Sequence, residues 1–297
     1  MRWTGGRKMK KLSILILTII LSIILVLTGC SQTSNVDKSN DTSGTTESND
    51  TSGTTETEED TSLEDIKAAG KFVVGLDDTF APMGFKDEDG NLVGFDIDTA
   101  KEVAKRMGVE VEFKSIDWQS KELELKSGKI DMIWNGLTIT EERKKNMAFT
   151  DPYLDNRQIV VVPIGSDIKT KADLAGKKVG LQQDSSALNA LMADEEIYNS
   201  VGEVVQYPEN FEALLDLQSG RIDAVIVDEI LGRYYINKNP GIYEILEEDF
   251  GDEEYGVGLR LKDKKLVEEI NRILKEMKED GTMAEISKKW FGEDIVK

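Results

Sequence analysis

Hydrophobic and polar residues divide the chain into three parts. A largely apolar run from Leu12 to Leu27 follows a basic start, and almost no apolar residue occurs between Ser31 and Thr61. From Ser62 onward, apolar residues recur at the spacings of short strands and amphipathic helices. We therefore expect an ordered body that begins at Ser62 and is preceded by a segment too polar to pack into a core.

The ordered body alternates strands and helices, which predicts an α/β fold with largely parallel sheets. The first half predicts a helix from 62 to the glycine at 70, a strand over 72–76, a helix over 97–107, a strand over 109–113, a helix near 123–125 and a strand over 130–134. The second half repeats the pattern, with strands over 178–181, 204–207 and 222–227 and helices over 186–192 and 211–217. An extended segment over 255–261 and amphipathic helices over 264–290 complete the body. Ser62 to Asp65 resemble a capping box for the first helix.

An internal echo suggests two similar lobes. The segment Leu125–Asp131 (LKSGKID) is similar in sequence to Leu217–Asp223 (LQSGRID). Both predict a helix end, a glycine C-cap and the start of a buried strand. The first strand leads to Asn135-Gly136 and the second to Asp228. Ligands of open α/β sheets sit outside the carboxyl ends of strands, so the two units would offer polar groups to a shared cleft. Taken alone, the echo is equally compatible with common turn chemistry.

Composition excludes several classes of function. Among 297 residues there are 37 Lys+Arg against 57 Asp+Glu, no histidine and one cysteine. The net charge of −20 argues against nucleic-acid binding, which needs a basic surface. Without histidine the chain has no Ser-His-Asp triad and no His-ligated zinc, and a single cysteine excludes a disulfide framework. Hydrolases that use carboxylates alone and proteins that bind without reacting remain.

The N-terminal segment predicts a lipid anchor. The apolar run is about 16 residues long, shorter than the ~20 residues of a spanning helix, which favours a signal peptide over residues 1–29. Its end, Leu27-Thr28-Gly29-Cys30, resembles the lipobox of bacterial lipoproteins. That resemblance implies that Cys30 is diacylated (with palmitate or a similar chain), becomes the new N-terminus and holds the protein on the extracytoplasmic face of the cell membrane. The alternative is a plain membrane anchor with an incidental cysteine.

Residues 30–61 are predicted to form a disordered tether. The nine residues Ser39–Glu47 repeat identically as Ser48–Glu56, and the Ser/Thr/Gly/Asp composition offers no hydrophobic face for stacking. A flexible segment of about 30 residues has a root-mean-square span near 30 Å. An anchored body could therefore reorient freely above the membrane.

Motifs in the ordered body resemble a known family. They are Gly94–Asp98 (GFDID), Ser127–Asp131 (SGKID), Leu137–Arg143 (LTITEER) and Phe149–Tyr153 (FTDPY), in this order. Together they resemble the solute-binding proteins of polar amino-acid ABC importers, family 3, from about Lys71 to Trp290. The resemblance implies a type II periplasmic-binding-protein-like α/β fold with two lobes, a hinge and an interlobe cleft. Lobe 1 would comprise residues 62–158 and 255–297 and lobe 2 residues 163–250, with crossovers at 158–163 and 252–256.

The resemblance also implies a site for a free amino acid. Burying a carboxylate and an ammonium requires opposite charges and full hydrogen bonding for both. Arg143 matches the family's carboxylate-binding arginine, helped by main-chain N–H groups at Thr138 and Ser186. Asp228 matches the ammonium-binding carboxylate, with carbonyl help near Asn135 or Gly136. Arg143 alone could also be a solvated residue of a charged run, and Asp228 a helix N-cap.

The family's remaining ligand contacts fall on two aromatic residues and one acid. Phe80 matches the aromatic residue that stacks on the ligand, and Trp118 lies where a second apolar wall is expected, although either could be core. Asp77 lies where some members bind a side-chain amine, and with Trp118 it weakly favours a basic amino acid. Trp134 is either pocket floor or core. Four features depart from the family: one proline in the Phe80 loop, Asn135-Gly136 for serines, Asp184 for glycine and Ala187 for a polar residue.

The resemblance implies a binding protein without catalytic residues, cofactor or metal. The open protein would bind the ligand on lobe 1, lobe 2 would close over it, and the closed form would dock on an ABC permease with its ATPase subunits. We expect a monomer. The alternatives are a dehydratase on the same fold, with Asp77 or Asp184 as proton donor, and an amino-acid sensor. The sequence does not identify the amino acid, nor does it decide whether adhesion or sensing accompanies transport.

Overall fold

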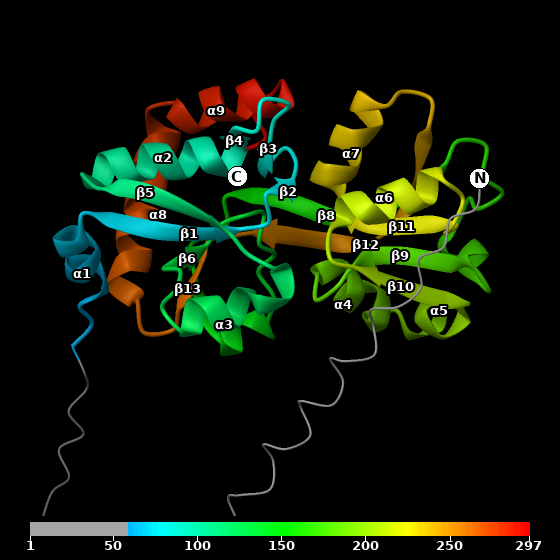
Figure 1. Ribbon diagram of the computed structural model, residues 1–297, viewed down its shortest axis with the longest axis horizontal. Helices are drawn as coiled ribbons and strands as arrows, with labels where there is room; N and C mark the ends of the chain where they lie inside the picture. Colours follow the sequence, from blue (N-terminus) through cyan, green and yellow to red (C-terminus); the bar gives the residue numbers. More distant parts are fainter. Residues whose placement is uncertain (1–58) are drawn as a thin grey trace, which may run out of the picture. The chain divides into compact units, whose positions relative to one another are not determined.

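Two five-stranded sheets form the body of residues 59–297, the part of the chain that the computed structural model describes. The predicted signal peptide, Cys30 and the tether up to residue 58 lie outside the described residues. The first sheet has the order β5-β1-β6-β13-β7 and the second the order β10-β9-β11-β8-β12. A small three-stranded sheet, β2-β3-β4, accompanies the first. The predicted α/β fold with two lobes is confirmed (Figure 1).

Lobe 1, as we use the term from here, is the first sheet with its helices and the small sheet. Its strands are β1 (Lys71–Leu76), β2 (Thr79–Phe80), β3 (Gly84–Lys86), β4 (Leu92–Val93), β5 (Glu110–Ser115), β6 (Met132–Ile133), β7 (Met147–Phe149) and β13 (Gly258–Arg260). Its helices are α1 (Ser62–Ala69), α2 (Phe95–Met107), α3 (Lys121–Lys126), α8 (Lys264–Glu279) and α9 (Thr282–Phe291), with 3₁₀ turns η1 (Trp118–Ser120) and η2 (Arg143–Lys145). Strand β1 pairs in parallel with β5 and β6, whereas β13 runs antiparallel to β6 and β7.

Lobe 2 is the second sheet with its helices. Its strands are β8 (Leu154–Pro163), β9 (Lys178–Gln182), β10 (Glu203–Tyr207), β11 (Ala224–Asp228) and β12 (Tyr243–Tyr255). Its helices are α4 (Ser186–Ala193), α5 (Glu195–Ser200), α6 (Asn210–Gln218) and α7 (Glu229–Lys238), with the 3₁₀ turn η3 (Lys171–Leu174). Strands β10, β9 and β11 are parallel, and β8 and β12 join antiparallel.

Strands β8 and β12 connect the two lobes. They pair with each other from Leu154–Tyr255 at one end to Pro163–Tyr243 at the other. Strand β8 also pairs with β11 from Gln158 onward, so from that residue it is part of the second sheet. In Figure 1 the two strands run from the middle of the molecule into lobe 2.

Amphipathic helices cover the sheet of lobe 1. In α2 the buried apolar residues are Phe95, Ile97, Ala100, Val103, Ala104 and Met107, and in α8 they are Leu266, Ile270, Ile273, Leu274 and Met277. Their three- and four-residue spacings place them on one face, and burying each large side chain contributes about 1.5–3 kcal/mol. Helix α2 begins after Gly94, where an added Cβ would lie 2.1 Å from the Met83 carbonyl oxygen. Any other residue would therefore push the helix away from β3.

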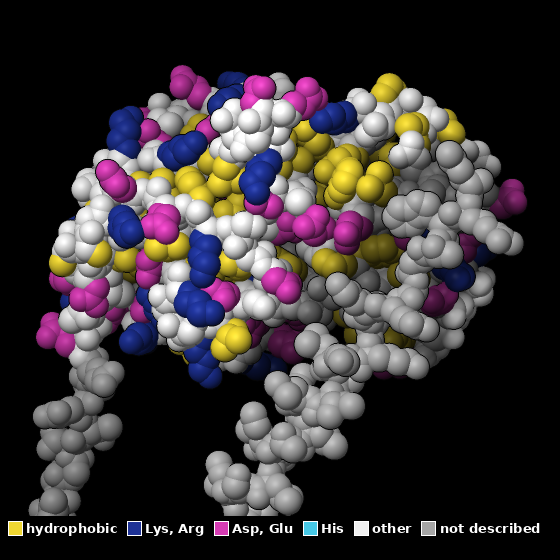
Figure 2. Space-filling view, in the orientation of Figure 1, with side chains coloured by type: hydrophobic (Ala, Val, Ile, Leu, Met, Phe, Trp, Pro, Cys, Tyr) yellow, Lys and Arg dark blue, Asp and Glu magenta, His cyan; other side chains and the backbone are white. Residues whose placement is uncertain are grey.

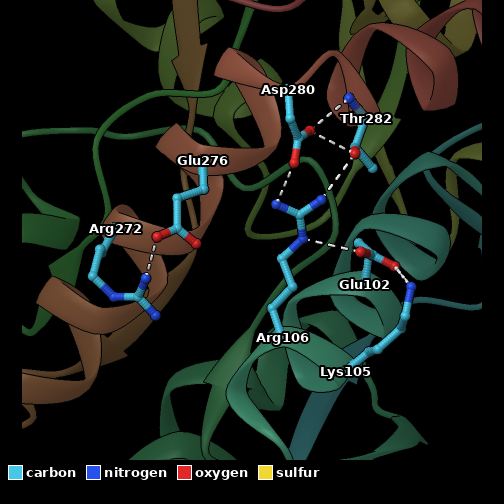
Figure 3. Close-up of polar contacts among 7 residues, drawn as sticks. All are labelled: Glu102, Lys105, Arg106, Arg272, Glu276, Asp280 and Thr282. Carbon is cyan, nitrogen blue, oxygen red and sulfur yellow. Dashed lines mark hydrogen bonds and ion pairs between the residues drawn. The ribbon is translucent and has the colours of Figure 1, made fainter.

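Arg106 ties α2 to the C-terminal helices (Figure 3). Its guanidinium donates to Glu102 Oε1 at 2.9 Å and to Thr282 Oγ1 at 2.9 Å, and it pairs with Asp280 at 2.7 Å. Asp280 in turn accepts from the amide of Thr282, at the junction of α8 and α9. One side chain thus fixes the packing of segments that lie 176 residues apart.

Two local predictions are wrong. The capping box does not form: Thr61 is the N-cap of α1 without a side-chain capping bond, because the Asp60 carboxylate accepts from the Ser62 amide at 2.9 Å. The strand expected over 130–134 is reduced to Met132–Ile133. Both glycines of the internal echo, Gly128 and Gly220, do follow their helices in the left-handed conformation. Within residues 59–297 no helix is both long and apolar enough to cross a membrane.

Candidate functional site

A single cavity between the lobes is lined by all nine residues predicted for the site: Asp77, Phe80, Trp118, Asn135, Gly136, Thr138, Arg143, Ser186 and Asp228. Two further residues, Gln182 and Ser185, line it as well. The empty space amounts to about 280 Å³, counted with its opening to solvent. Lobe 1 contributes the first seven of these residues and lobe 2 the others, so the cavity exists only when the lobes face each other.

Arg143 supplies the buried cation of the cavity. It begins η2, directly after the Leu137–Glu142 loop, and is only 6 % exposed. Its Nη1 donates to the Thr138 carbonyl oxygen at 2.9 Å, which is its one side-chain hydrogen bond among the described residues. Burial lowers its pKa, although the carboxylates of Asp184, Glu253 and Asp228 oppose this effect. Most of the guanidinium fork therefore remains available for a bidentate contact with a carboxylate.

Asp228 supplies the buried carboxylate on lobe 2. It ends β11, where Oδ1 accepts from Tyr255 Oη at 2.7 Å, Asn156 Nδ2 at 2.7 Å and Gln158 Nε2 at 3.0 Å. Burial, followed by the charge of Glu253, raises its pKa to about 7. Asp228 is the N-cap residue of α7, as the alternative interpretation expected, but its carboxylate makes no capping hydrogen bond. A buried carboxyl group held in this way gains by pairing with a cation.

Thr138 joins the two lobes next to these charges. Its Oγ1 lies 3.1 Å from Ser186 Oγ across the cleft and donates to Glu253 Oε2 at 2.9 Å. Glu253 also accepts from Gln158 Nε2 at 2.8 Å and Asn156 Nδ2 at 3.1 Å. Sequence reasoning missed Glu253 because it is one of several acidic residues near the end of a long strand. It links both connecting strands to lobe 1.

Asp77 forms a second contact across the cleft. Its Oδ2 accepts from Gln182 Nε2 at 2.9 Å, while Oδ1 accepts from the Thr79 amide at 2.9 Å. The Asp77 amide donates to Asn135 Oδ1 at 3.0 Å. Gln182 was missed by sequence reasoning, although the signal was present: it is the last residue of a parallel strand, as Asp228 is.

The aromatic wall of the cavity depends on a glycine. Gly136 has φ 55°, and an added Cβ would lie 3.0 Å from Phe80 Cε1 and 3.0 Å from Tyr255 Cε2. The Gly136 amide donates to Asp96 Oδ2 at 2.7 Å, and Tyr153 Oη donates to the same oxygen at 3.1 Å. Burial raises the Asp96 pKa to about 7. The departure from serine at this position thus makes room for the ring of Phe80.

Two other sequence features have clear places in the structure. Trp134 is fully buried and packs against Tyr153 with ring centroids 6.4 Å apart, so it is core and not pocket floor. Ala187 is buried in the core of lobe 2 and does not line the cavity. Among residues 59–297, no group of three or more His, Cys, Asp or Glu is arranged to hold a metal ion.

Comparison with known proteins assigns the family. The family model of bacterial extracellular solute-binding proteins, family 3, matches residues 72–293. The chain belongs to this family. The L-cystine-binding protein TcyJ of Escherichia coli K12 is 35 % identical to this solute-binding protein over 237 residues, which cover 79 % of this chain and 88 % of TcyJ. The histidine-binding periplasmic protein of Salmonella typhimurium LT2 is 36 % identical over 233 residues, 76 % of this chain and 89 % of that protein.

The fold agrees with solved members of the family. An ABC uptake transporter substrate-binding protein from Streptococcus pneumoniae with bound histidine has a TM-score of 0.78 and 38 % identity, covering 80 % of this chain and 98 % of its own. The predicted type II periplasmic-binding-protein-like fold, with two lobes, a hinge and an interlobe cleft, is therefore confirmed.

Proposed function

We propose that this solute-binding protein captures a free polar amino acid for an ABC importer. The observation that carries the proposal is the cavity in which buried Arg143 of lobe 1 and buried Asp228 of lobe 2 face a common space. The α-carboxylate of the ligand pairs with Arg143 and its ammonium with Asp228, so that both ends of the zwitterion leave water with opposite charges beside them. Relatives that bind cystine and histidine support the ligand class.

A basic side chain is the preferred fit for the rest of the cavity. Phe80 and Trp118 supply aromatic walls, and the Asp77 carboxylate, held by Gln182 and Thr79, supplies a negative charge at the lining. A cationic side chain placed there is stabilised both by the π faces of the aromatic rings and by the negative charge of the carboxylate. The roles of the nine predicted residues, including the main-chain contacts of Thr138 and Ser186, belong to this proposal.

Capture proceeds by closure of the lobes about β8 and β12. For this motion we propose lobe 1 as residues 62–158 and 255–297 and lobe 2 as residues 163–250. The start of β8 then moves with lobe 1, and the connecting strands act as the hinge. Closing expels water and brings Asp228 over a ligand already held by Arg143. The closed form then delivers the amino acid to an ABC permease driven by its ATPase subunits. The protein acts as a monomer.

Binding without reaction is favoured over a dehydratase. A dehydratase needs a proton donor free to face the leaving group, whereas Asp77 is engaged by Gln182 and Thr79 and Asp184 is engaged by Lys121. Stoichiometric thermal stabilisation by an amino acid, without product, would support the receptor. Formation of product from the ligand would support the enzyme.

We further propose that Cys30 anchors the protein to the outer face of the membrane through attached acyl chains. The lipobox at Leu27–Cys30 supports this location. Metabolic labelling with palmitate tests it: the wild-type chain should carry label in the membrane fraction, and Cys30→Ser should lose it. Label retained by Cys30→Ser would contradict the anchor.

A calorimetric experiment tests the function. A thermal-shift screen of the twenty amino acids with ornithine, citrulline and cystine identifies the ligand, and titration then compares the wild type with Arg143→Ala and Asp228→Ala. Removing one partner of a buried charge pair costs about 2–5 kcal/mol, so each variant should bind at least about 30-fold more weakly. Either variant binding within fivefold of wild type would contradict the site.

A further inference from the structure

Lys121 is a buried cation that the proposed ligand site does not use. It begins α3 of lobe 1, and its side chain is only 1 % exposed. Its ammonium donates to the Trp118 carbonyl oxygen at 3.1 Å and lies 5.0 Å from the centre of the Trp118 ring. A buried ammonium needs partners for all three of its hydrogens. Lobe 1 supplies only one of those partners.

Asp184 of lobe 2 supplies the other two. The ammonium donates to the Asp184 carbonyl oxygen at 3.0 Å, and it forms an ion pair with the carboxylate of the same residue. Lys297 of lobe 1 also pairs with Asp155 and Glu254 on the connecting strands, whereas the Lys121–Asp184 pair reaches the loop between β9 and α4 of lobe 2. The pair lies at the edge of the cleft, outside the lining of the cavity.

The backbone of Asp184 supports a specific role for this side chain. With φ 53°, it is the one residue other than glycine that has a positive φ in the described part of the chain. This conformation is unfavourable for residues with a Cβ. An unfavourable backbone conformation beside a cleft needs a stabilising interaction that offsets its cost. The ion pair and hydrogen bond to Lys121 supply that interaction.

The pair is coupled to the proposed ligand site through two residues. Trp118 both lines the cavity and accepts a hydrogen bond from Lys121. Burial lowers the pKa of Lys121, and the positive charge of nearby Arg143 lowers it further. A ligand carboxylate on Arg143 would offset that repulsion, so ligand binding should favour the closed arrangement of the pair.

We propose that Lys121 and Asp184 form an ionic latch that holds the two lobes together over the ligand. When the lobes separate, the ammonium loses two of its three hydrogen bonds, so the latch acts mainly on the rate of opening and ligand release. This inference rests on the proposed function, because the dissociation experiment needs a bound amino acid. Lys121 and Asp184 are positioning residues, since neither lines the cavity.

Ligand dissociation kinetics test the latch. The full chain is loaded with L-arginine, L-histidine or L-cystine, whichever binds wild type most tightly, and displacement is followed by stopped flow. Lys121→Met, Asp184→Gly and Asp184→Asn should each release ligand roughly 10- to 50-fold faster, with association within about threefold of wild type. Asp184→Gly also relieves the backbone, and Asp184→Asn keeps a side chain there, so together they separate charge from conformation.

A double-mutant cycle and a matched control make the test specific. The double variant Lys121→Met/Asp184→Gly should release ligand about as fast as either single variant, because only one interaction is lost. Lys114→Met breaks an ion pair with Glu124 inside lobe 1 and should leave release unchanged. Release from Asp184→Asn within twofold of wild type, or fully additive effects in the double variant, would overturn the latch.

A ligand-independent measurement separates the latch from the proposed function. Spin labels at Glu110→Cys on β5 and Glu203→Cys on β10, in a chain with Cys30→Ser, report the distance between the lobes. Without ligand, Lys121→Met should shift the distribution to longer distances. If wild type binds no amino acid, the proposed function fails, while this shift still supports the latch. An unchanged distribution with ligand binding intact would reject the latch alone.

Discussion

The amide of Gly136 donates a 2.7 Å hydrogen bond to Oδ2 of Asp96, forty residues earlier in the chain. The same oxygen accepts from Tyr153 Oη at 3.1 Å. This carboxyl group therefore fixes the backbone turn against which Phe80 lies, although Asp96 itself is fully buried and outside the cavity. Asp96 is the third residue of the Gly94–Asp98 segment, and its carboxylate supports the backbone beside the cavity.

Asp96→Ala should destabilise the protein more than Asp96→Asn. Alanine leaves the Gly136 amide and the Tyr153 hydroxyl without a partner, at about 1–3 kcal/mol each, whereas asparagine keeps an acceptor oxygen. Urea unfolding at pH 7 measures both variants. Equal stabilities for the two would show that the carboxyl oxygens do not hold the turn.

Gly136→Ala should impair both stability and ligand binding. The positive φ disfavours alanine by about 1–2 kcal/mol, and the Cβ contacts with Phe80 and Tyr255 add an overpacking cost of about 1–3 kcal/mol. Displacement of the Phe80 ring should weaken binding by about tenfold or more. Gly128→Ala is the matched control, because its glycine has a positive φ but open space around it. If both variants bound ligand equally well, crowding at Phe80 would not matter.

Affinity should fall as the pH is lowered through about 7. The pKa of Asp228 is raised to about 7 by burial and by Glu253, while Arg143 favours the carboxylate. The ligand ammonium pairs with the carboxylate, so binding below the pKa requires proton release, and affinity should drop by up to about tenfold per pH unit. Calorimetry in buffers of different ionisation enthalpy measures the released proton. Constant affinity between pH 8 and 5.5 would contradict this linkage.

Stability without ligand should show the opposite trend. Since the folded pKa of Asp228 lies above its unfolded value, the folded state binds a proton that the unfolded state lacks between about pH 4 and 7. This group therefore contributes stability as the pH falls from 8 towards 5. Asp228→Asn should remove this pH-dependent contribution to the free energy of unfolding. Urea unfolding measures it in the Asp96→Asn background, because the Asp96 pKa is also raised to about 7 and would give a similar pH dependence. A pH profile unchanged by Asp228→Asn would contradict the assignment.

Asp77→Asn should change selectivity more than overall affinity. The variant keeps one acceptor oxygen, so it can retain the contact with Gln182 or the contacts with Thr79 but not both, and it removes the negative charge proposed for a cationic side chain. Affinity for arginine and lysine should fall by about tenfold or more, while affinity for glutamine should change less than threefold. Titration with each amino acid gives the ratio. A uniform loss for all ligands would indicate a structural role.

The chemistry of the cavity could largely be read from sequence, because the family motifs and the strand ends mark it. Arg143 ends the motif Leu137–Arg143, and Asp228 ends the buried strand that follows the second copy of the internal echo. Gln182 ends a neighbouring strand and could have been found by the same rule.

Contacts between distant segments could not be read in this way. Glu253 reaches Thr138 across 115 residues, and Lys121 reaches Asp184 across 63, so neither follows from local spacing. The capping box failed for a related reason, since Asp60 competes for the Ser62 amide and also accepts from the Lys265 amide at 2.7 Å. Local patterns predict elements, whereas the partners of polar side chains depend on how those elements meet.

Aromatic rings of the two lobes, Phe85 and Tyr234, lie with their centroids 5.7 Å apart, and Figure 2 shows hydrophobic side chains gathered between β3 and α7.

The two lobes face different constraints during folding. The sheet of lobe 1 needs β13, which follows all of lobe 2 in the chain. The segment from Leu154 to Tyr255 is continuous, and its two ends pair with each other. That segment contains all the strands of its own sheet, whereas the sheet of lobe 1 stays incomplete until β13 has joined it.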